Sequence, residues 1–224
     1  MNPRTVGFAL VAALTVVTPA AAQAPSEPIG RLQVGVGVGW LGGASFGGQP
    51  ADLRTTSGGP YRLFESETDL GAAASFELRV GVGLTPRFGV EGRVARSGPE
   101  LKASVSSDAE ASGTFTISES IDQYVFDGGV VIRLNEFPAM GLLPFVSAGA
   151  GYVRQLHEGD SLVEEGQLFY AGGGFTRVLF PRPQGFVRAA SVRADLRLKV
   201  LSLDLEADSS RLQGSLAGSI VFTF

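Results

Sequence analysis

The sequence predicts an all-β protein, an eight-stranded antiparallel up-and-down β-barrel that spans a membrane. Three observations lead to this prediction. Eight segments alternate between apolar and polar residues with the period of two that side chains follow along a strand. The connections between the segments alternate between long polar stretches and short turns that contain proline. Glycines and charged residues share one face of the strands, while the opposite face is apolar.

The final segment, residues 211–224 (RLQGSLAGSIVFTF), has the clearest alternation. Leu212 and Ile220 lie on one side of the expected strand, and Gln213 and Ser219 lie on the other. The segment is longer than the usual strand of a soluble sheet. This segment therefore predicts a strand with one apolar face and one polar face.

Seven earlier segments repeat the pattern. The eight predicted strands are 31–41, 71–84, 88–97, 121–134, 145–155, 166–180, 186–201 and 211–224. The short turns between them are 85–87, 135–144 and 181–185, and each contains proline, which the centre of a strand does not tolerate.

The long connections are predicted as polar loops. Residues 42–70 are rich in glycine, serine, threonine and acids, and residues 98–120 have a similar composition. Within the second loop, Leu101, Ala103 and Val105 alternate with polar residues, which suggests that strands project there beyond the main sheet. Short turns at one end and long loops at the other are typical of transmembrane barrels, in which an even strand count places both termini on the periplasmic side.

The amino terminus predicts export. Residues 6–17 form an apolar run of 12 residues after Arg4, and Ala20-Ala21-Ala22 fits a signal-peptide cleavage site. We expect a signal peptide at 1–22, a short periplasmic lead-in at 23–30 and the barrel at 31–224. The alternative, an uncleaved anchor helix, is disfavoured because the run is too short to span a bilayer.

A membrane barrel turns its apolar face outward to the lipid. A soluble lipocalin-like barrel, the alternative, would put its apolar face inward around a ligand. Strand glycines would weaken a solvated exterior, but in a narrow lumen they leave room for long charged side chains that pair across it. The predicted lumen charge network is Glu77, Arg79, Glu91, Arg93, Asp127, Arg133, Arg193, Asp195 and Arg197.

Aromatic residues near the strand ends of the apolar face predict girdles at the two membrane interfaces. The alternative is that they are ordinary core aromatics. The predicted girdle comprises Trp40, Phe88, Tyr124, Tyr152, Tyr170, Phe180, Phe186 and Phe222.

The signal peptide, the eight alternating strands and the terminal VFTF resemble the small outer-membrane β-barrels of Gram-negative bacteria, of the OmpA/OmpX type. The resemblance covers residues 31–224. It implies a location in the bacterial outer membrane, a charged lumen network, and contact with outer-membrane lipids and lipopolysaccharide. It also implies that the carboxy-terminal Phe224 is the signal read by the barrel-assembly machinery.

The composition excludes several kinds of chemistry. The chain has no cysteine, so disulfides and thiolate metal sites are excluded, and its pI of about 5.1 gives no basic surface for nucleic acid. His157, the only histidine, lies near Ser161 in a polar stretch with no apolar shelter to orient a base. Acidic residues in the loops could bind divalent cations, but they more simply keep the loops soluble. We therefore predict no catalytic residues, metal or cofactor.

Three functions remain open. The first and favoured one is a structural or surface-interaction barrel with a plugged lumen, whose loops contact a partner that the sequence does not identify. The second is a narrow passive pore for ions or small solutes. The third is an outer-membrane lipid-modifying enzyme. A wide channel is disfavoured, because eight strands enclose little more than their own side chains.

Overall fold

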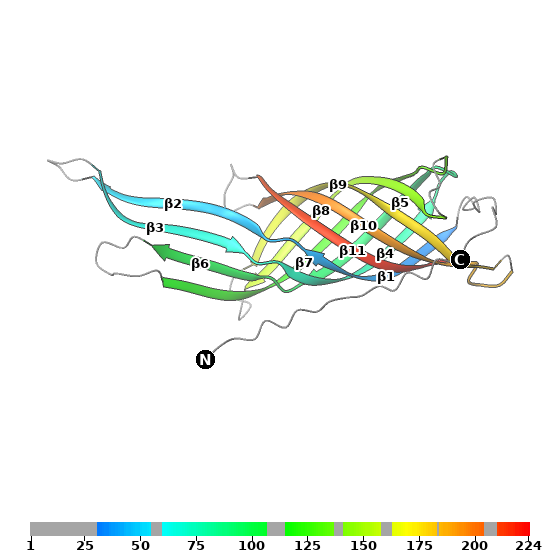
Figure 1. Ribbon diagram of the computed structural model, residues 1–224, viewed down its shortest axis with the longest axis horizontal. Helices are drawn as coiled ribbons and strands as arrows, with labels where there is room; N and C mark the ends of the chain where they lie inside the picture. The colour runs from blue at the N-terminus through cyan, green and yellow to red at the C-terminus, as the bar shows by residue number, and fades with distance from the viewer. Residues whose placement is uncertain are drawn as a thin grey trace.

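The computed structural model describes residues 31–54, 60–106, 115–136, 141–157, 163–182, 184–203 and 210–224. The predicted signal peptide and lead-in lie outside these residues. The described part contains eleven strands and is drawn in Figure 1. They are β1 (Leu32–Leu41), β2 (Ala44–Arg54), β3 (Pro60–Leu70), β4 (Ala73–Gly83), β5 (Phe88–Ser97), β6 (Glu100–Ser106), β7 (Phe115–Arg133), β8 (Leu143–His157), β9 (Val163–Pro181), β10 (Ala189–Leu203) and β11 (Ser210–Thr223).

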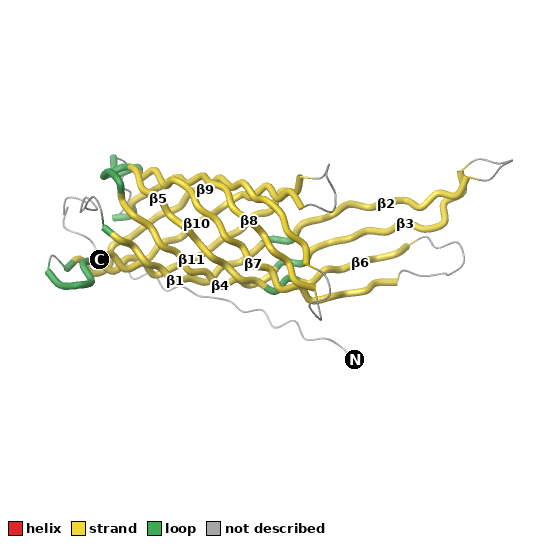
Figure 2. The backbone as a smooth tube through the Cα atoms, turned by 180° about the vertical axis from the view of Figure 1, so that it is seen from behind, coloured by secondary structure: helices red, strands yellow, loops and turns green. Residues whose placement is uncertain are grey.

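Eight of these strands form a closed antiparallel barrel, as predicted. Their order is β1-β4-β5-β7-β8-β9-β10-β11, and β11 pairs with β1 to close the ring. The backbone N–H of Phe224 donates to the carbonyl of Leu32 at 2.9 Å, so the start of β1 and the end of β11 meet at one end. The turns 84–87 and 184–188 lie at this same end, which we call the turn end (Figure 2).

The remaining strands build a second sheet that projects from the opposite end of the barrel (Figures 1 and 2). Its order is β2-β3-β6 followed by the first part of β7. The prediction of a loop at 42–70 is therefore wrong, because β2 and β3 occupy most of it. The loop predicted at 98–120 is also wrong as a whole, since β6 and the start of β7 lie there. The projecting strand that the alternation of Leu101, Ala103 and Val105 suggested within it is confirmed by β6. We call these four strands the projecting sheet and this end of the barrel the projecting end.

Three of the four strands that leave the barrel are interrupted at the same level. Gly42-Gly43 separates β1 from β2, Gly71-Ala72 separates β3 from β4, and Gly98-Pro99 separates β5 from β6. Backbone hydrogen bonds cross these interruptions, among them Gly71 N–H to the carbonyl of Glu100 at 2.7 Å. β7 has no interruption and runs through both sheets. The inward-facing set of residues changes from even to odd numbers across Gly71-Ala72, whereas it stays odd across Gly98-Pro99 and along β7.

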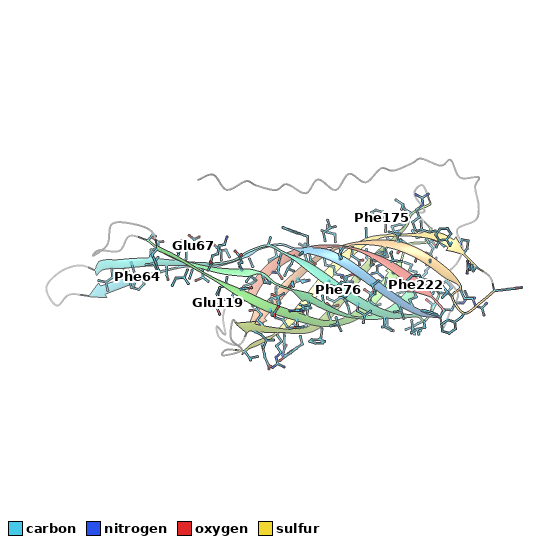
Figure 3. The ribbon with its side chains drawn as sticks, turned by 90° about the horizontal axis from the view of Figure 1, so that it is seen from below. Phe64, Glu67, Phe76, Glu119, Phe175 and Phe222 are labelled. Carbon is cyan, nitrogen blue, oxygen red and sulfur yellow. The ribbon has the colours of Figure 1, made fainter. Side chains whose placement is uncertain are left out.

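The outer surface of the barrel is apolar. Side chains with large exposed fractions occur on every barrel strand, including Trp40 at 56%, Leu196 at 60% and Leu216 at 56%. Figure 3 shows Phe76, Phe175 and Phe222 on this surface. Alternate residues of the same strands are buried in the lumen, and many of them are charged. Among the described residues no helix is long and apolar enough to cross a membrane.

Candidate functional site

Eight charged side chains from four strands meet in the barrel lumen. They come from β4, β5, β7 and β10, and none is more than 9% exposed. The eight are Glu77, Arg79, Glu91, Arg93, Asp127, Arg193, Asp195 and Arg197. Their positions follow from strand alternation, since each lies two residues from another charged residue or from a lumen glycine on its own strand.

Glu91 is the centre of one half of this cluster. The guanidinium of Arg193 donates to Glu91 at 2.8 Å and to Asp195 at 2.9 Å. Arg197 donates to Glu91 at 2.8 Å and to Asp127 at 3.2 Å. Glu91 therefore accepts hydrogen bonds from two arginines that lie more than one hundred residues away in the chain.

Glu77 joins the other half. Arg93 donates to Glu77 at 3.1 Å and is also bonded to Asp127. Arg79 is bonded to Glu77 and lies 3.0 Å from Asp195. The four arginines and four carboxylates thus form one connected, charge-balanced cluster. Such balance matters because an uncompensated charge in a narrow interior costs several kcal/mol.

Glycines on the neighbouring strands make room for the long side chains. A Cβ atom at Gly35 would lie 2.8 Å from Cγ of Arg79, and one at Gly172 would lie 2.9 Å from Cγ of Arg197. These distances are shorter than carbon atoms tolerate. The glycines of the lumen face are therefore a packing requirement of the charged cluster.

Arg133, the ninth residue of the predicted network, lies nearer the turn end. It is half-buried and stands next to Gly89, where a Cβ atom would lie 3.3 Å from its guanidinium. There it lines a small cavity of about 30 Å³ together with Gln33, Glu91 and Arg193. Phe145 also lines this cavity, and the guanidinium of Arg193 lies over its ring, 4.0 Å from the ring centre.

An apolar layer lies in the lumen on the projecting side of the charged cluster. It consists of Ala95, Val125, Val153, Leu168, Tyr170 and Leu201, none more than 8% exposed. This layer was not predicted from the sequence, although strand alternation places most of its members on the lumen face. Val125 lies two residues from Asp127 and Leu201 lies four residues from Arg197, so each shares the inward face of its strand with a charged residue.

Tyr170 was predicted on the outer girdle, and this is wrong. It is 4% exposed, and its ring lies in the lumen with the guanidinium of Arg197 4.7 Å from its centre. The cause is a β-bulge in β9, where the register with β10 shifts between Ala190 and Ser191. Its neighbour Phe169 points outward and is 58% exposed. The bulge makes Leu179 the extra residue, so even-numbered residues point inward before it whereas Phe180 points outward.

We expect Tyr170→Leu to destabilise the barrel by about 1–3 kcal/mol, because it opens a void beside Arg197 in the packed lumen. Phe169→Leu is the matched change on the outer face of the same strand, and we expect it to cost clearly less. Urea unfolding of the protein refolded in detergent micelles, followed by circular dichroism, measures both. A larger loss for Phe169→Leu would contradict the inward placement of Tyr170.

The other predicted girdle residues lie on the outside. Trp40, Phe88, Tyr152, Phe180 and Phe222 are between 37% and 67% exposed. Phe186 is 84% exposed and lies in the turn before β10 rather than within a strand, with its ring 5.0 Å from that of Phe224. Tyr124 is half-buried on the outer face, with Arg96 5.6 Å from its ring centre.

The side chains of His157 and Ser161, the two residues weighed for catalysis, lie outside what the structure describes, although the backbone of His157 ends β8. Across the described ranges no group of three or more His, Cys, Asp or Glu side chains is arranged to hold a metal ion.

The chain is similar to known outer-membrane proteins. A family model described as "Outer membrane protein beta-barrel domain" matches residues 8–177. Among solved structures, Ail, the attachment invasion locus protein of Yersinia pestis, is 15% identical, with 88% of this chain and 100% of that chain covered and a TM-score of 0.43. OprG from Pseudomonas aeruginosa is 10% identical, with 88% and 96% covered and a TM-score of 0.48. No curated protein sequence matches the chain.

Proposed function

The chain belongs to the outer membrane protein beta-barrel domain family and lies in the bacterial outer membrane, and we propose from this that it is a surface-interaction barrel with a closed lumen. In this proposal the barrel anchors the protein in the membrane, and the projecting sheet is the part that contacts partners. The start of β1 and the carboxy-terminal Phe224 lie at the turn end. If this end faces the periplasm, as in transmembrane barrels generally, the projecting sheet stands outside the cell.

The projecting sheet is the observation that carries the proposal. Its two faces differ in chemistry. The registers put Glu67, Ser104 and Thr116 side by side on one face, with the hydroxyls of Ser104 and Thr116 3.1 Å apart. The other face carries Phe64 and Ile117, which are 38% and 58% exposed. Figure 3 shows Glu67 on one side of the sheet and Phe64 on the other.

The apolar face continues the inner side of the barrel. Along the uninterrupted β7, Phe115 and Ile117 have the parity of Ile121, which is 1% exposed inside the barrel. Phe115 is 66% exposed. A sheet face with large exposed apolar side chains, rimmed by polar ones, marks a site of interaction with another molecule. In the described part of the chain, β2 forms one edge of the sheet and residues 115–120 of β7 form the other, and such edges can pair with a further strand.

The lumen favours a closed barrel over a pore. The charged cluster fills one cross-section, and the apolar layer fills the next one toward the projecting end. Closer to the mouth, the amide of Gln155 donates to Gln123 at 2.9 Å. In this proposal water would have to pass the charged cluster, the apolar layer and this amide pair. We further propose that Phe224 is read by the barrel-assembly machinery and that the outer wall contacts lipid and lipopolysaccharide.

Removal of the projecting sheet tests the proposal. In a shortened variant, short turns replace residues 42–72 and 98–120, so that β1 joins β4 and β5 joins the barrel part of β7. We expect this variant to insert as a heat-modifiable barrel, because the eight-stranded ring is intact. Cells that display it should lose attachment and cell–cell aggregation down to the level of cells without the protein. Attachment equal to that of the full chain would contradict the proposal.

Conductance separates the closed barrel from the narrow pore. We expect the full chain, inserted in a planar bilayer, to give no current steps above the bare bilayer. The shortened variant tests whether the projecting sheet, rather than the lumen, blocks the current. We expect it to give no current steps either. Regular steps from the full chain would favour the passive pore.

A lipid-modifying activity abolished by His157→Ala and Ser161→Ala together would favour the enzyme instead.

A further inference from the structure

One stretch of the barrel wall is basic and contains no acidic residue. Between Glu165 and Asp195 the chain has four arginines and no aspartate or glutamate. Arg193 points into the lumen, where it belongs to the charged cluster. The other three lie at the turn end of the β9–β10 hairpin, and they are Arg177, Arg182 and Arg188. This end of the hairpin therefore carries an excess of positive charge.

Arg177 occupies a lipid-facing position. It is exposed and lies on the outer face of β9 between Phe175 and Leu179, which are 47% and 46% exposed. Its partner on β10 is Val192, which is also exposed. An arginine on the lipid face of a barrel is destabilising unless its guanidinium reaches the membrane interface. Arg177 is four residues from the end of β9, close enough for its guanidinium to reach the lipid headgroups.

Arg182 and Arg188 continue this outer face past the ends of the two strands. The backbone N–H of Arg182 donates to the carbonyl of Arg188 at 2.6 Å, so the two residues stand opposite each other. They follow Phe180 and Ala190, the last pair of the ladder on the outer face. Like charges directly opposite each other destabilise a sheet. The terminal carboxylate of Phe224, next to Arg188, balances at most one of these charges, so the hairpin end favours a bound anion.

An apolar groove begins beside Arg177 on the same wall. It has a volume of about 600 Å³, and its lining includes Ala171, Gly173, Phe175, Ala194, Leu196 and Leu216. Its turn-end edge is formed by Phe175 and Ala194, which lie two residues from Arg177 and from its partner Val192. Figure 3 shows Phe175 on the outer wall. The far edge, at Ala171, lies about 13 Å further along β9. The groove thus offers room to an acyl chain that enters the membrane at the level of Arg177.

We propose that this wall binds one anionic phospholipid, such as phosphatidylglycerol. The phosphate is held by Arg177, Arg182 and Arg188, and one acyl chain lies in the groove. Guanidinium groups bind phosphate through paired N–H donors, and a zwitterionic lipid competes poorly because it carries its own cation. A free phosphate would gain nothing from the groove. The assignment to the periplasmic leaflet, which holds phospholipids, rests on the orientation proposed above, whereas the binding itself does not.

Native mass spectrometry of the refolded full chain tests the headgroup contact. The chain in detergent micelles is offered phosphatidylglycerol or phosphatidylcholine with the same acyl chains. We expect one phosphatidylglycerol to be retained, with an affinity about tenfold or more above that of phosphatidylcholine. Arg177→Gln should lower this preference about fivefold, and glutamine at all three arginines should abolish it. Arg87→Gln is the matched control and should keep the preference, because Arg87 is exposed at the same end but pairs with Glu136 in the β4–β5 turn region.

The groove is tested separately. Ala194→Phe fills its turn-end edge without a change of charge, and we expect it to weaken phosphatidylglycerol binding about tenfold. Ala74→Phe makes the same change at an exposed position of β4 and should leave binding unchanged. Heat-modifiable gel migration checks that each variant is folded. Equal retention of the two lipids, or a preference that survives the loss of the three arginines, would overturn the proposal. Undiminished binding by Ala194→Phe, or glycerol 3-phosphate bound as tightly as the lipid, would overturn it as well.

Discussion

Replacing Glu91 by alanine is expected to lower the free energy of unfolding of the barrel by about 3–5 kcal/mol. The change leaves Arg193 and Arg197 without the carboxylate that each contacts at 2.8 Å, and Arg79 without a charge 4.0 Å away. Because all three guanidinium groups are buried, they are left with a positive charge that the remaining carboxylates do not balance. Arg193→Ala should act in the same direction, since it leaves Glu91 and Asp195 short of a cation. Urea unfolding in micelles measures both losses.

The matched control for this prediction is Asp122→Ala. Asp122 pairs with Arg96 at 3.1 Å, but the two side chains are 47% and 60% exposed on the outer surface. An exposed ion pair contributes at most about 1 kcal/mol, so this variant should stay close to the wild type. If Glu91→Ala and Arg193→Ala leave both stability and conductance unchanged, the lumen network has no structural role.

Valine at position 149 is expected to destabilise the barrel by about 3 kcal/mol or more, or to prevent its folding. Gly149 faces the lumen at the point where β8 and β7 approach each other beneath the ring of Tyr170. A Cβ atom there would lie 2.7 Å from Cα of Gly129 and 2.8 Å from Cε1 of Tyr170. The backbone of a barrel strand cannot move away without breaking its hydrogen bonds to the neighbouring strands. The clash therefore cannot be relieved without a loss of stability. Heat-modifiable gel migration and urea unfolding would report the loss.

Gly218→Val is the control, because it makes the same substitution on the outer face. A Cβ atom at Gly218 meets nothing within 4 Å. The added methyl groups would extend into lipid, and valine favours extended backbone, so we expect a change within about 0.5 kcal/mol of the wild type or a slight gain. If Gly149→Val and Gly218→Val destabilise the barrel equally, glycine is required for the backbone conformation of the strands and not for space in the lumen.

The barrel could be predicted from the sequence because the membrane constrains every strand in the same way. Lipid outside and charged side chains inside produce a period-two pattern in all eight strands, from Val36 in β1 to Phe222 in β11. The projecting sheet has no such constraint. Its strands lie beyond the apolar belt, so residues such as Glu65 and Asp69 on β3 occupy positions where a membrane strand would carry apolar groups. A polar, glycine-containing strand cannot be told from a loop by composition.

Within the lumen, the charged residues could be predicted and one aromatic could not. Opposite charges two residues apart, as in Glu77 and Arg79, stand out among few charged residues overall. The side on which Tyr170 lies depends on a bulge near Leu179, where Leu179 and Phe180 both point outward. Bulges leave little trace in local sequence, because the extra residue can be of almost any type. The apolar layer was missed for a different reason, since an inward valine looks like any other apolar residue of a strand.

The continuity of β7 has a mechanical consequence. The strand spans 19 residues, or about 60 Å, and is the one uninterrupted connection between the two sheets in the described chain. A force applied at the tip of the projecting sheet would travel along this strand as tension. In the barrel, β7 is held on both sides by ladders to β5 and β8, so the load would be resisted in shear by many hydrogen bonds at once. The glycine-rich interruptions of the other strands would yield first and act as a compliant joint, which would protect the membrane anchor from the pull on the part outside.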